Sequence, residues 1–314
     1  MTDTKPEPFS FASMQQAAPV HIPEKQFMAS HDGTSLAYYP FLAEKQNVAN
    51  VILIHGGGTH SLAGYEHIAD TLQHDFHVNT FLLDLRGHGH SDGKKGDTPS
   101  VTDVWQDISQ FVDAVKQQHK GAVYLCGHSS GAGLLLNYLS WAKKREVDGY
   151  FFIAPEFGYQ SDTARLDQIP FATVQVWKFV LSAMTKGRLM GHSEAVRFHY
   201  PAWTVEQDPL LLTAITVNLS LALTPSTPKK QFAMMDRPYA MLVGSEDELY
   251  DIEKFPAYHE LPHEEIKQQS VYEVLDGHTH LSGVTRSRKT YWKGHPNVES
   301  FYLVGTTSQH FPLF

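Results

Sequence analysis

Cysteine and basic residues are scarce in this chain of 314 residues, and each scarcity excludes a class of protein. Cys126 is the single cysteine, so no internal disulfide can form, as is usual in a reducing compartment. Acidic residues outnumber basic ones for a net charge of −9, and the longest basic cluster is Lys143-Lys144-Arg145. We therefore expect no nucleic-acid partner.

Long apolar runs are also lacking. The longest, Leu210 to Leu223, is interrupted by polar residues and is shorter than the roughly 20 residues that a membrane-spanning helix needs. The stretch from Met1 to Ser10 carries Asp3, Lys5 and Glu7 around no apolar core, so it does not resemble a signal peptide. We predict a cytoplasmic protein without a transmembrane segment.

The overall composition, with 42% hydrophobic and 19% charged residues, is that of an ordinary globular protein. Residues 1–24 are proline-rich and aperiodic, which predicts an extended N-terminal arm. Two strand-like runs, Lys25 to Ser30 and Ser35 to Phe41, flank the turn dipeptide Asp32-Gly33 and predict a hairpin. Further strands are predicted at 50–55, 78–84, 122–126, 149–154, 238–243 and 270–275, and helices at 65–72, 101–119 and 134–141. Strands that alternate with helices indicate an α/β protein with a mostly parallel, doubly wound sheet.

This alternation stops after residue 156. No strand-like run follows before residue 236, and aromatic residues are frequent there: Phe157, Tyr159, Phe171, Trp177, Phe179 and Trp203. We predict a helical insertion at 157–235 above the sheet, with residues 25–156 and 236–314 forming the core domain. The tail from residue 294 to residue 314 carries no pattern that assigns it a role.

The pentapeptide Gly127-His128-Ser129-Ser130-Gly131 lies between the strand predicted at 122–126 and the start of a helix, so a serine stands in a sharp strand-to-helix turn. Such a turn strains its central residue and leaves room only for small residues two positions away on either side, where Gly127 and Gly131 stand. The Ser129 hydroxyl would project from the sheet edge, in front of backbone N–H groups at the helix N-terminus. Ser129 is therefore our candidate nucleophile.

A serine hydroxyl needs a general base, and the base needs a partner that orients it. Four carboxylates follow the strand predicted at 238–243: Glu246, Asp247, Glu248 and Asp251. Two histidines follow the strand predicted at 270–275: His278 and His280. Because the carboxyl ends of parallel strands meet at one edge of a sheet, we expect both loops to converge on Ser129.

A glycine loop, His55-Gly56-Gly57-Gly58, follows the first strand expected to be buried and parallel. Adjacent glycines let the backbone come close to a ligand and present N–H groups to it. The N–H of Gly57 and that of Ser130 would form an oxyanion hole, where the loss of one donor typically costs roughly 3–4 kcal/mol of transition-state stabilisation.

The order glycine loop, serine, aspartate and histidine, with Asp84-Leu85-Arg86-Gly87-His88-Gly89-His90-Ser91-Asp92-Gly93 between the first two, resembles the α/β-hydrolase superfamily. The chain is similar to the branch of monoacylglycerol lipases, lysophospholipases and serine aminopeptidase-like hydrolases, above all over His55 to Leu72 (HGGGTHSLAGYEHIADTL). The resemblance covers about residues 25–156 and 236–290. Ser130 departs from it, since family members often have Met or Gln after the nucleophile.

The resemblance implies an α/β-hydrolase fold in which the insertion forms a cap over the site. The family pattern Gly-x-x-His selects His280 as the base, with His278 packing nearby, and Gly-x-x-Asp selects Asp247 as its partner. The aromatic residues of the cap fit an acyl pocket and a plain core equally well, so both interpretations stay open.

Among the 19 histidines, His88 with His90 and His278 with His280 have a spacing that suits metal ligands. Both pairs already have a place in the hydrolase pattern, so we predict no metal and no cofactor. His55 and His128 flank the expected site and are interpreted as structural.

These features predict a serine hydrolase that cleaves carboxylic esters through an acyl-enzyme on Ser129, such as an esterase or a monoacylglycerol lipase or lysophospholipase. The expected partner is a small-molecule ester or lipid, while the substrate-binding residues and the oligomeric state stay open. The same scaffold suits an amidase or aminopeptidase, a C–C bond hydrolase, or a relative that binds a ligand without catalysis. Dehalogenase and epoxide hydrolase chemistry fits less well, because those relatives carry a carboxylate where Ser129 stands.

Overall fold

A computed structural model describes residues 19–44, 47–167 and 170–282, and three short strands further along the chain: Lys293–Gly294 (β12), Phe301–Leu303 (β13) and Phe311–Leu313 (β14). These three strands pair antiparallel in a small sheet of their own. Most of the N-terminal arm predicted at 1–24 lies outside the described residues, and residues 19–25 have no regular secondary structure.

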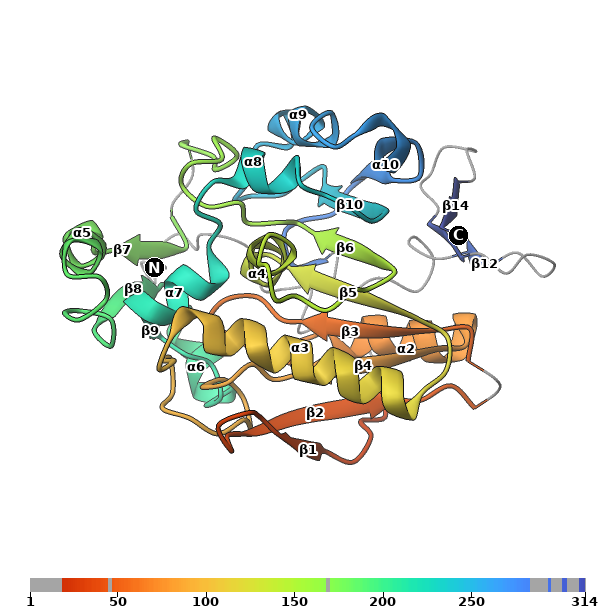
Figure 1. Cartoon of the computed structure of the whole chain (residues 1–314), viewed down its shortest axis with the longest axis horizontal. Coiled ribbons are helices and arrows are strands. Elements are labelled where there is room, and N and C mark those ends of the chain that lie inside the picture. The colour runs from red at the N-terminus through yellow and green to blue at the C-terminus, as the bar shows by residue number, and fades with distance from the viewer. Residues whose placement is uncertain are drawn as a thin grey trace, which may run out of the picture.

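An eight-stranded sheet forms the centre of the fold (Figure 1). In chain order its strands are Gln26–Ala29 (β1), Ser35–Phe41 (β2), Ala49–Ile54 (β3), Val78–Leu83 (β4), Ala122–His128 (β5), Gly149–Ile153 (β6), Tyr239–Gly244 (β10) and Val271–Leu275 (β11). They lie side by side in the order β1-β2-β4-β3-β5-β6-β10-β11. The pairs β1–β2 and β2–β4 are antiparallel and all the others are parallel, so the hairpin and the mostly parallel sheet predicted from the sequence are confirmed.

The parallel strands in the middle of the sheet are covered on both faces. Every residue of β3, β4 and β10 is buried, which is why these strands read as continuous apolar runs without alternation. Helices Val101–Gln118 (α3) and Ser130–Leu139 (α4) contribute to the apolar cluster on one face, and Glu66–Phe76 (α2) to the cluster on the other. The fold is thus a sheet between two layers of helices.

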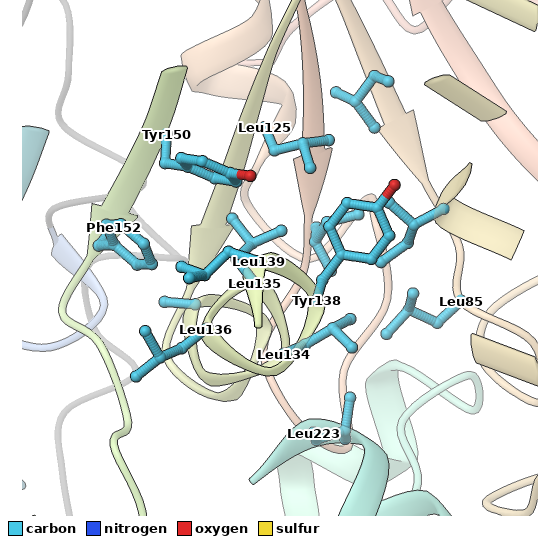
Figure 2. Packing of buried hydrophobic residues seen from close by; sticks show 14 of the residues in the cluster. Leu85, Leu125, Leu134, Leu135, Leu136, Tyr138, Leu139, Tyr150, Phe152 and Leu223 are labelled. Atoms are coloured by element: carbon cyan, nitrogen blue, oxygen red, sulfur yellow. The ribbon is translucent and has the colours of Figure 1, made fainter. Parts of the chain in front are cut away.

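Helix α4, which follows the strand-to-helix turn, is buried over its whole length of ten residues. Figure 2 shows its leucines in one cluster with residues of β5, β6 and the insertion: Leu134, Leu135, Leu136, Leu139, Leu125, Tyr150, Phe152 and Leu223. The Tyr138 hydroxyl in the same helix contacts Ser109 Oγ at 3.0 Å and accepts the Arg145 N–H at 2.8 Å. Since each buried leucine stabilises the fold by roughly 1.5–3 kcal/mol, this packing holds the helix firmly behind the turn.

The segment between β6 and β10 contains helices and strands, at the carboxyl ends of the parallel strands (Figure 1, left). Its helices are Val176–Met184 (α5), Ala202–Gln207 (α6), Val217–Leu223 (α7) and Pro228–Phe232 (α8). Three strands pair antiparallel in the order β7-β8-β9: Ala172–Val174 (β7), Glu194–Phe198 (β8) and Ala214–Thr216 (β9). The expectation that no strand lies in this segment is therefore wrong. Strands of three to five residues are too short to produce a recognisable alternation in the sequence. The boundaries of the predicted domains stay a prediction.

Three short helices between β10 and β11 were not predicted from the sequence: Ile252–Lys254 (η1), Pro256–His259 (α9) and Glu264–Gln268 (α10). Each is shorter than two turns and shows no helical period. None of the helices in the described part of the chain combines the length and the apolar character that a membrane crossing requires.

Candidate active site

Ser129 stands in a strained turn between β5 and α4. Its backbone angles, φ 54° and ψ −122°, lie in a region that residues other than glycine rarely adopt. A Cβ atom on Gly127 would come within 2.6 Å of the Ala132 nitrogen, and one on Gly131 within 2.6 Å of the Ile54 carbonyl oxygen. Neither position therefore has room for a side chain, as the sequence pattern of the pentapeptide predicted.

Asp247 and His280 are paired below the surface. The Asp247 Oδ2 atom lies 2.9 Å from His280 Nδ1, and only 2% of each residue is exposed. The other oxygen, Oδ1, accepts the backbone N–H groups of Leu249 at 2.9 Å and Tyr250 at 3.0 Å. Burial raises the pKa of the Asp247 carboxyl, but His280 and the two amides outweigh this and hold that pKa below its usual value. The group is thus a fixed carboxylate that orients the imidazole.

The other carboxylates and the second histidine of these loops have different surroundings. Glu246 is exposed, Glu248 accepts the backbone N–H of His280 at 3.0 Å, and Asp251 accepts the backbone N–H of Glu253 at 3.1 Å. The carbonyl of His278 accepts the Glu246 N–H at 2.9 Å, so this histidine ties the two loops together through its backbone. The Asp247 carboxylate is the one whose hydrogen bond to the imidazole of His280 supports its predicted role.

Tyr250 connects Ser129 with His280, and nothing in the sequence pointed to it. Its phenol lies close to the Ser129 side chain, and its ring centre lies 5.4 Å from that of His280. Burial, together with the nearby carboxylates of Glu156 and Asp247, raises the pKa of Tyr250 well above its usual value, so the phenol stays protonated. Ser129 and His280 therefore both border one phenol side chain.

Glu156 brings a second carboxyl group to this side of the turn. It follows β6, and its backbone N–H donates to the Ser129 carbonyl at 3.0 Å. Burial raises the pKa of its carboxyl, and the nearby His280 offsets only part of that rise. In the sequence, residue 156 stood out only as the point where the alternation of strands and helices stops.

His128 joins the glycine loop to the histidine loop through a chain of hydrogen bonds. Its Nε2 atom lies 3.1 Å from the His280 carbonyl oxygen, which can only accept, so Nε2 carries the proton. Burial lowers the pKa of His128 to about 3, so its Nδ1 is free of a proton and accepts the Tyr65 hydroxyl at 2.9 Å. Tyr65 in turn accepts the Gly56 N–H at 2.8 Å. His128 was interpreted as structural, but its partner Tyr65 carried no signal in the sequence.

The glycine loop lies directly against the strand-to-helix turn. A Cβ atom on Gly56 would lie 3.4 Å from Ser129 Cβ, and one on Gly57 would lie 2.6 Å from Ser130 Oγ. His55 holds the base of the loop, because its Nε2 accepts the Leu85 N–H at 3.2 Å and its Nδ1 donates to the Gly56 carbonyl at 2.8 Å. The structure thus places the glycine loop against Ser129 and Ser130, and it places the His280 ring, paired with Asp247, 4.9 Å from the ring of His128, the neighbour of Ser129.

Residues of the insertion cover the glycine loop. The Leu212 N–H donates to the Gly58 carbonyl at 2.8 Å, and the Tyr200 hydroxyl donates to the Gly57 carbonyl at 3.4 Å. A Cβ atom on Gly58, whose φ is 72°, would come within 2.5 Å of the Phe198 ring. The insertion is therefore hydrogen-bonded to the glycine loop, which is predicted to supply one N–H group of the oxyanion hole.

The aromatic residues of the insertion have several separate environments. Phe157 is fully buried in the core, 4.7 Å from the ring of Tyr258, whereas Trp177 is largely exposed. Phe171 stacks on Phe198 with ring centres 5.5 Å apart, so this pair belongs to the layer above the glycine loop. Phe157 is thus a core residue, whereas an acyl pocket lined by the other aromatic residues stays a prediction.

The close histidine pairs do not form a ligand cluster. His88 Nδ1 lies 3.2 Å from the Arg86 carbonyl, and His90 Nδ1 lies 2.8 Å from the Tyr39 hydroxyl. Among the described residues no group of three or more His, Cys, Asp or Glu side chains is arranged to hold a metal ion.

Known proteins resemble this chain in sequence. A family model described as serine aminopeptidase, S33, matches residues 45–281. Monoglyceride lipase of Saccharomyces cerevisiae is 31% identical over 147 residues, which are 43% of this chain and 44% of that protein. Uncharacterized protein YnbC of Escherichia coli is 26% identical over 240 residues, which are 72% of this chain and 38% of that protein. The chain spans less than half the length of these two relatives.

Solved structures share the architecture at low sequence identity. A soluble variant of monoglyceride lipase from Saccharomyces cerevisiae, in complex with a substrate analog, has a TM-score of 0.64 at 18% identity, covering 85% of this chain and 92% of that one. The esterase EaEST from Exiguobacterium antarcticum has a TM-score of 0.57 at 18% identity, covering 82% of this chain and 92% of that one. These similarities establish the α/β-hydrolase fold. Because the family model matches most of the sequence, the chain belongs to the serine aminopeptidase S33 family of α/β-hydrolases.

Proposed function

We propose that the chain is a serine hydrolase that cleaves carboxylic esters through an acyl-enzyme on Ser129. The observation that carries the proposal is the strained backbone of Ser129, at φ 54°, beside a buried Asp247–His280 pair. Strain of this kind persists only where the surroundings enforce it, and here two glycines and the buried helix α4 do so.

In the proposed reaction His280 removes the Ser129 proton as the hydroxyl oxygen attacks the ester carbonyl carbon. The Asp247 carboxylate holds the imidazole through Nδ1 and stabilises the imidazolium that forms. The N–H groups of Gly57 and Ser130 receive the negative oxygen of the tetrahedral intermediate. His280 then gives its proton to the departing alcohol, and a water molecule hydrolyses the acyl-enzyme by the same steps.

Three groups around Ser129 support this assignment by positioning its partners. The Tyr250 phenol lies close to the Ser129 side chain, and the Tyr65–His128 pair joins the glycine loop to His280. None of these steps calls for a metal or a cofactor, because the nucleophile, base and oxyanion donors are all supplied by the chain.

The monoglyceride lipase and esterase among the similar proteins favour an ester substrate, whereas the description of the matching family favours an aminoacyl amide. The exposed apolar residues of the insertion, such as Trp177 and Met184, are compatible with a lipid-like acyl group. We therefore place esters first, and an amidase or aminopeptidase is the second candidate.

The test compares the full chain with two serine variants on p-nitrophenyl esters of increasing acyl length and on an aminoacyl p-nitroanilide. Ser129→Ala is expected to lower kcat by roughly 10⁴-fold or more, because the nucleophile is lost. The matched control is Ser140→Ala at the far end of the same segment. Its hydroxyl donates to the carbonyls of Leu136 and Asn137 and accepts the Gln231 side-chain amide, so its loss should leave kcat unchanged.

A fluorophosphonate probe separates catalysis from binding. We expect covalent labelling of the wild type and of Ser140→Ala, and none of Ser129→Ala. Full activity of Ser129→Ala would refute the nucleophile, preference for the anilide would favour the aminopeptidase, and an unlabelled wild type that still binds esters would identify a binding protein.

A further inference from the structure

The side chain of Ser130 is buried and has no hydrogen-bond partner. Only 5% of the residue is exposed, and its Oγ atom makes no hydrogen bond to any residue that the structure describes. A buried hydroxyl without a partner destabilises the folded state, so folded proteins seldom retain one at a site that does not use it. Ser130 directly follows the proposed nucleophile.

The Ser130 hydroxyl occupies space that Gly57 leaves open. A Cβ atom on Gly57 would lie 2.6 Å from Ser130 Oγ and 3.6 Å from Ser130 Cβ. The φ angle of Gly57 is not positive, so its backbone conformation does not require glycine. Glycine is required because a side chain at this position would collide with the Ser130 hydroxyl. The Phe198 ring, 3.4 Å from the same point, closes this space from the side of the insertion.

We propose that the Ser130 hydroxyl is a third donor of the oxyanion hole, which rests on the proposed esterase function. The backbone N–H groups of Gly57 and Ser130 are the other two donors, and the hydroxyl lies in contact with Gly57. A hydroxyl hydrogen can turn toward an acceptor, and the acceptor arrives when Ser129 attacks and the carbonyl oxygen becomes negative. Because the bond forms chiefly in the transition state, it increases kcat more than it lowers KM.

The main test is Ser130→Ala, assayed on a p-nitrophenyl ester that the wild type hydrolyses. We expect kcat to fall by roughly 10- to 100-fold and KM to change by less than about 2-fold. This decrease in kcat is at most similar to the one that follows the loss of one oxyanion-hole donor in other enzymes. Butylboronic acid, which forms a tetrahedral adduct with a nucleophilic serine, should bind more weakly by a similar factor. Butyrate, which forms no adduct, should bind Ser130→Ala and the wild type equally.

The melting temperature distinguishes this role from packing. Ser130→Ala removes a hydroxyl that has no partner, so its melting temperature should equal or exceed that of the wild type. A residue that only supports the fold would give the opposite combination, with a lower melting temperature and an unchanged kcat. That combination, or wild-type kcat in Ser130→Ala, would overturn the proposal.

Gly57→Ala provides an independent test of the same contact. The added Cβ would come within 2.6 Å of Ser130 Oγ and displace the hydroxyl, so kcat should fall as in Ser130→Ala. In the double variant the steric conflict is absent, and the loss should be close to that of Ser130→Ala alone. If the double variant regained wild-type kcat, the hydroxyl would be only a filler and the proposal would fail. Inactivity of the wild type toward esters would refute the proposed function instead, since all these comparisons presuppose an active parent.

Discussion

Replacing Asp247 by Asn tests how the carboxylate controls the proton on His280. The two oxygens of Asp247 have different partners, because Oδ1 accepts the N–H groups of Leu249 and Tyr250 while Oδ2 faces His280 Nδ1 at 2.9 Å. In Asp247→Asn the carbonyl oxygen must keep the position of Oδ1, since an NH₂ group there would meet two donors. The NH₂ group then points at His280 Nδ1 and donates to it, which forces the imidazole proton onto Nε2.

An imidazole protonated at Nε2 cannot take the Ser129 proton, so kcat should fall about 10⁴-fold, the loss known for this substitution in a serine protease. The fold should persist, because the amide is the same size and keeps both backbone hydrogen bonds. We would measure kcat on a p-nitrophenyl ester and the rate of fluorophosphonate labelling, which should fall together. Glu246→Gln is the matched control, since it removes the same charge at an exposed neighbouring residue. A loss below about tenfold in Asp247→Asn, or an equal loss in Glu246→Gln, would refute this reasoning.

Three further substitutions probe the supports of the site and the fold. Gly131→Ala places a Cβ atom within 2.6 Å of the Ile54 carbonyl oxygen, so urea unfolding should show a stability loss of about 1–3 kcal/mol or more. Unchanged stability would contradict the claim that only glycine fits at this position. His128→Phe keeps a slightly larger aromatic ring but removes the partner of the Tyr65 hydroxyl hydrogen and of the His280 carbonyl, so we expect a stability loss of roughly 1–3 kcal/mol and a lower kcat in the same assays. The Arg86 hydrogen bond lowers the pKa of Asp32. The ionised Asp32 therefore stabilises the fold above about pH 4, and this stabilisation is lost as the pH falls. Asp32→Asn lacks the titrating group, so its free energy of unfolding should decrease less than that of the wild type between pH 5 and pH 2.

The central strands could be predicted because burial on both faces imposes a visible composition. The strand predicted at 50–55 is found as β3 at Ala49–Ile54, and the strand predicted at 238–243 is found as β10 at Tyr239–Gly244. Once these strands are parallel, the loops that follow them must meet at one edge of the sheet. The proximity of Asp247 to His280, 33 positions apart, follows from that geometry.

Contacts that depend on side-chain direction could not be predicted in this way. Tyr250 follows Asp247 by three positions in a loop, where no period determines which way a side chain points. Tyr65 contacts His128 although the two residues are 63 positions apart, and no sequence motif connects them. The strands β7, β8 and β9 were missed for a different reason, because short and partly exposed strands carry too few residues to alternate.

The glycine loop is held by hydrogen bonds from two sides, which under the proposed function would link substrate selection to catalysis. From the core, the Tyr65 hydroxyl accepts the Gly56 N–H, and Tyr65 contacts His128, whose other nitrogen donates to His280. From the insertion, the Leu212 N–H donates to the Gly58 carbonyl. Under the proposed function, a movement of the insertion that admits a larger acyl group would therefore pull on the loop that carries the Gly57 N–H. Substitutions in this part of the insertion should alter kcat together with acyl-chain preference, since the same backbone serves both.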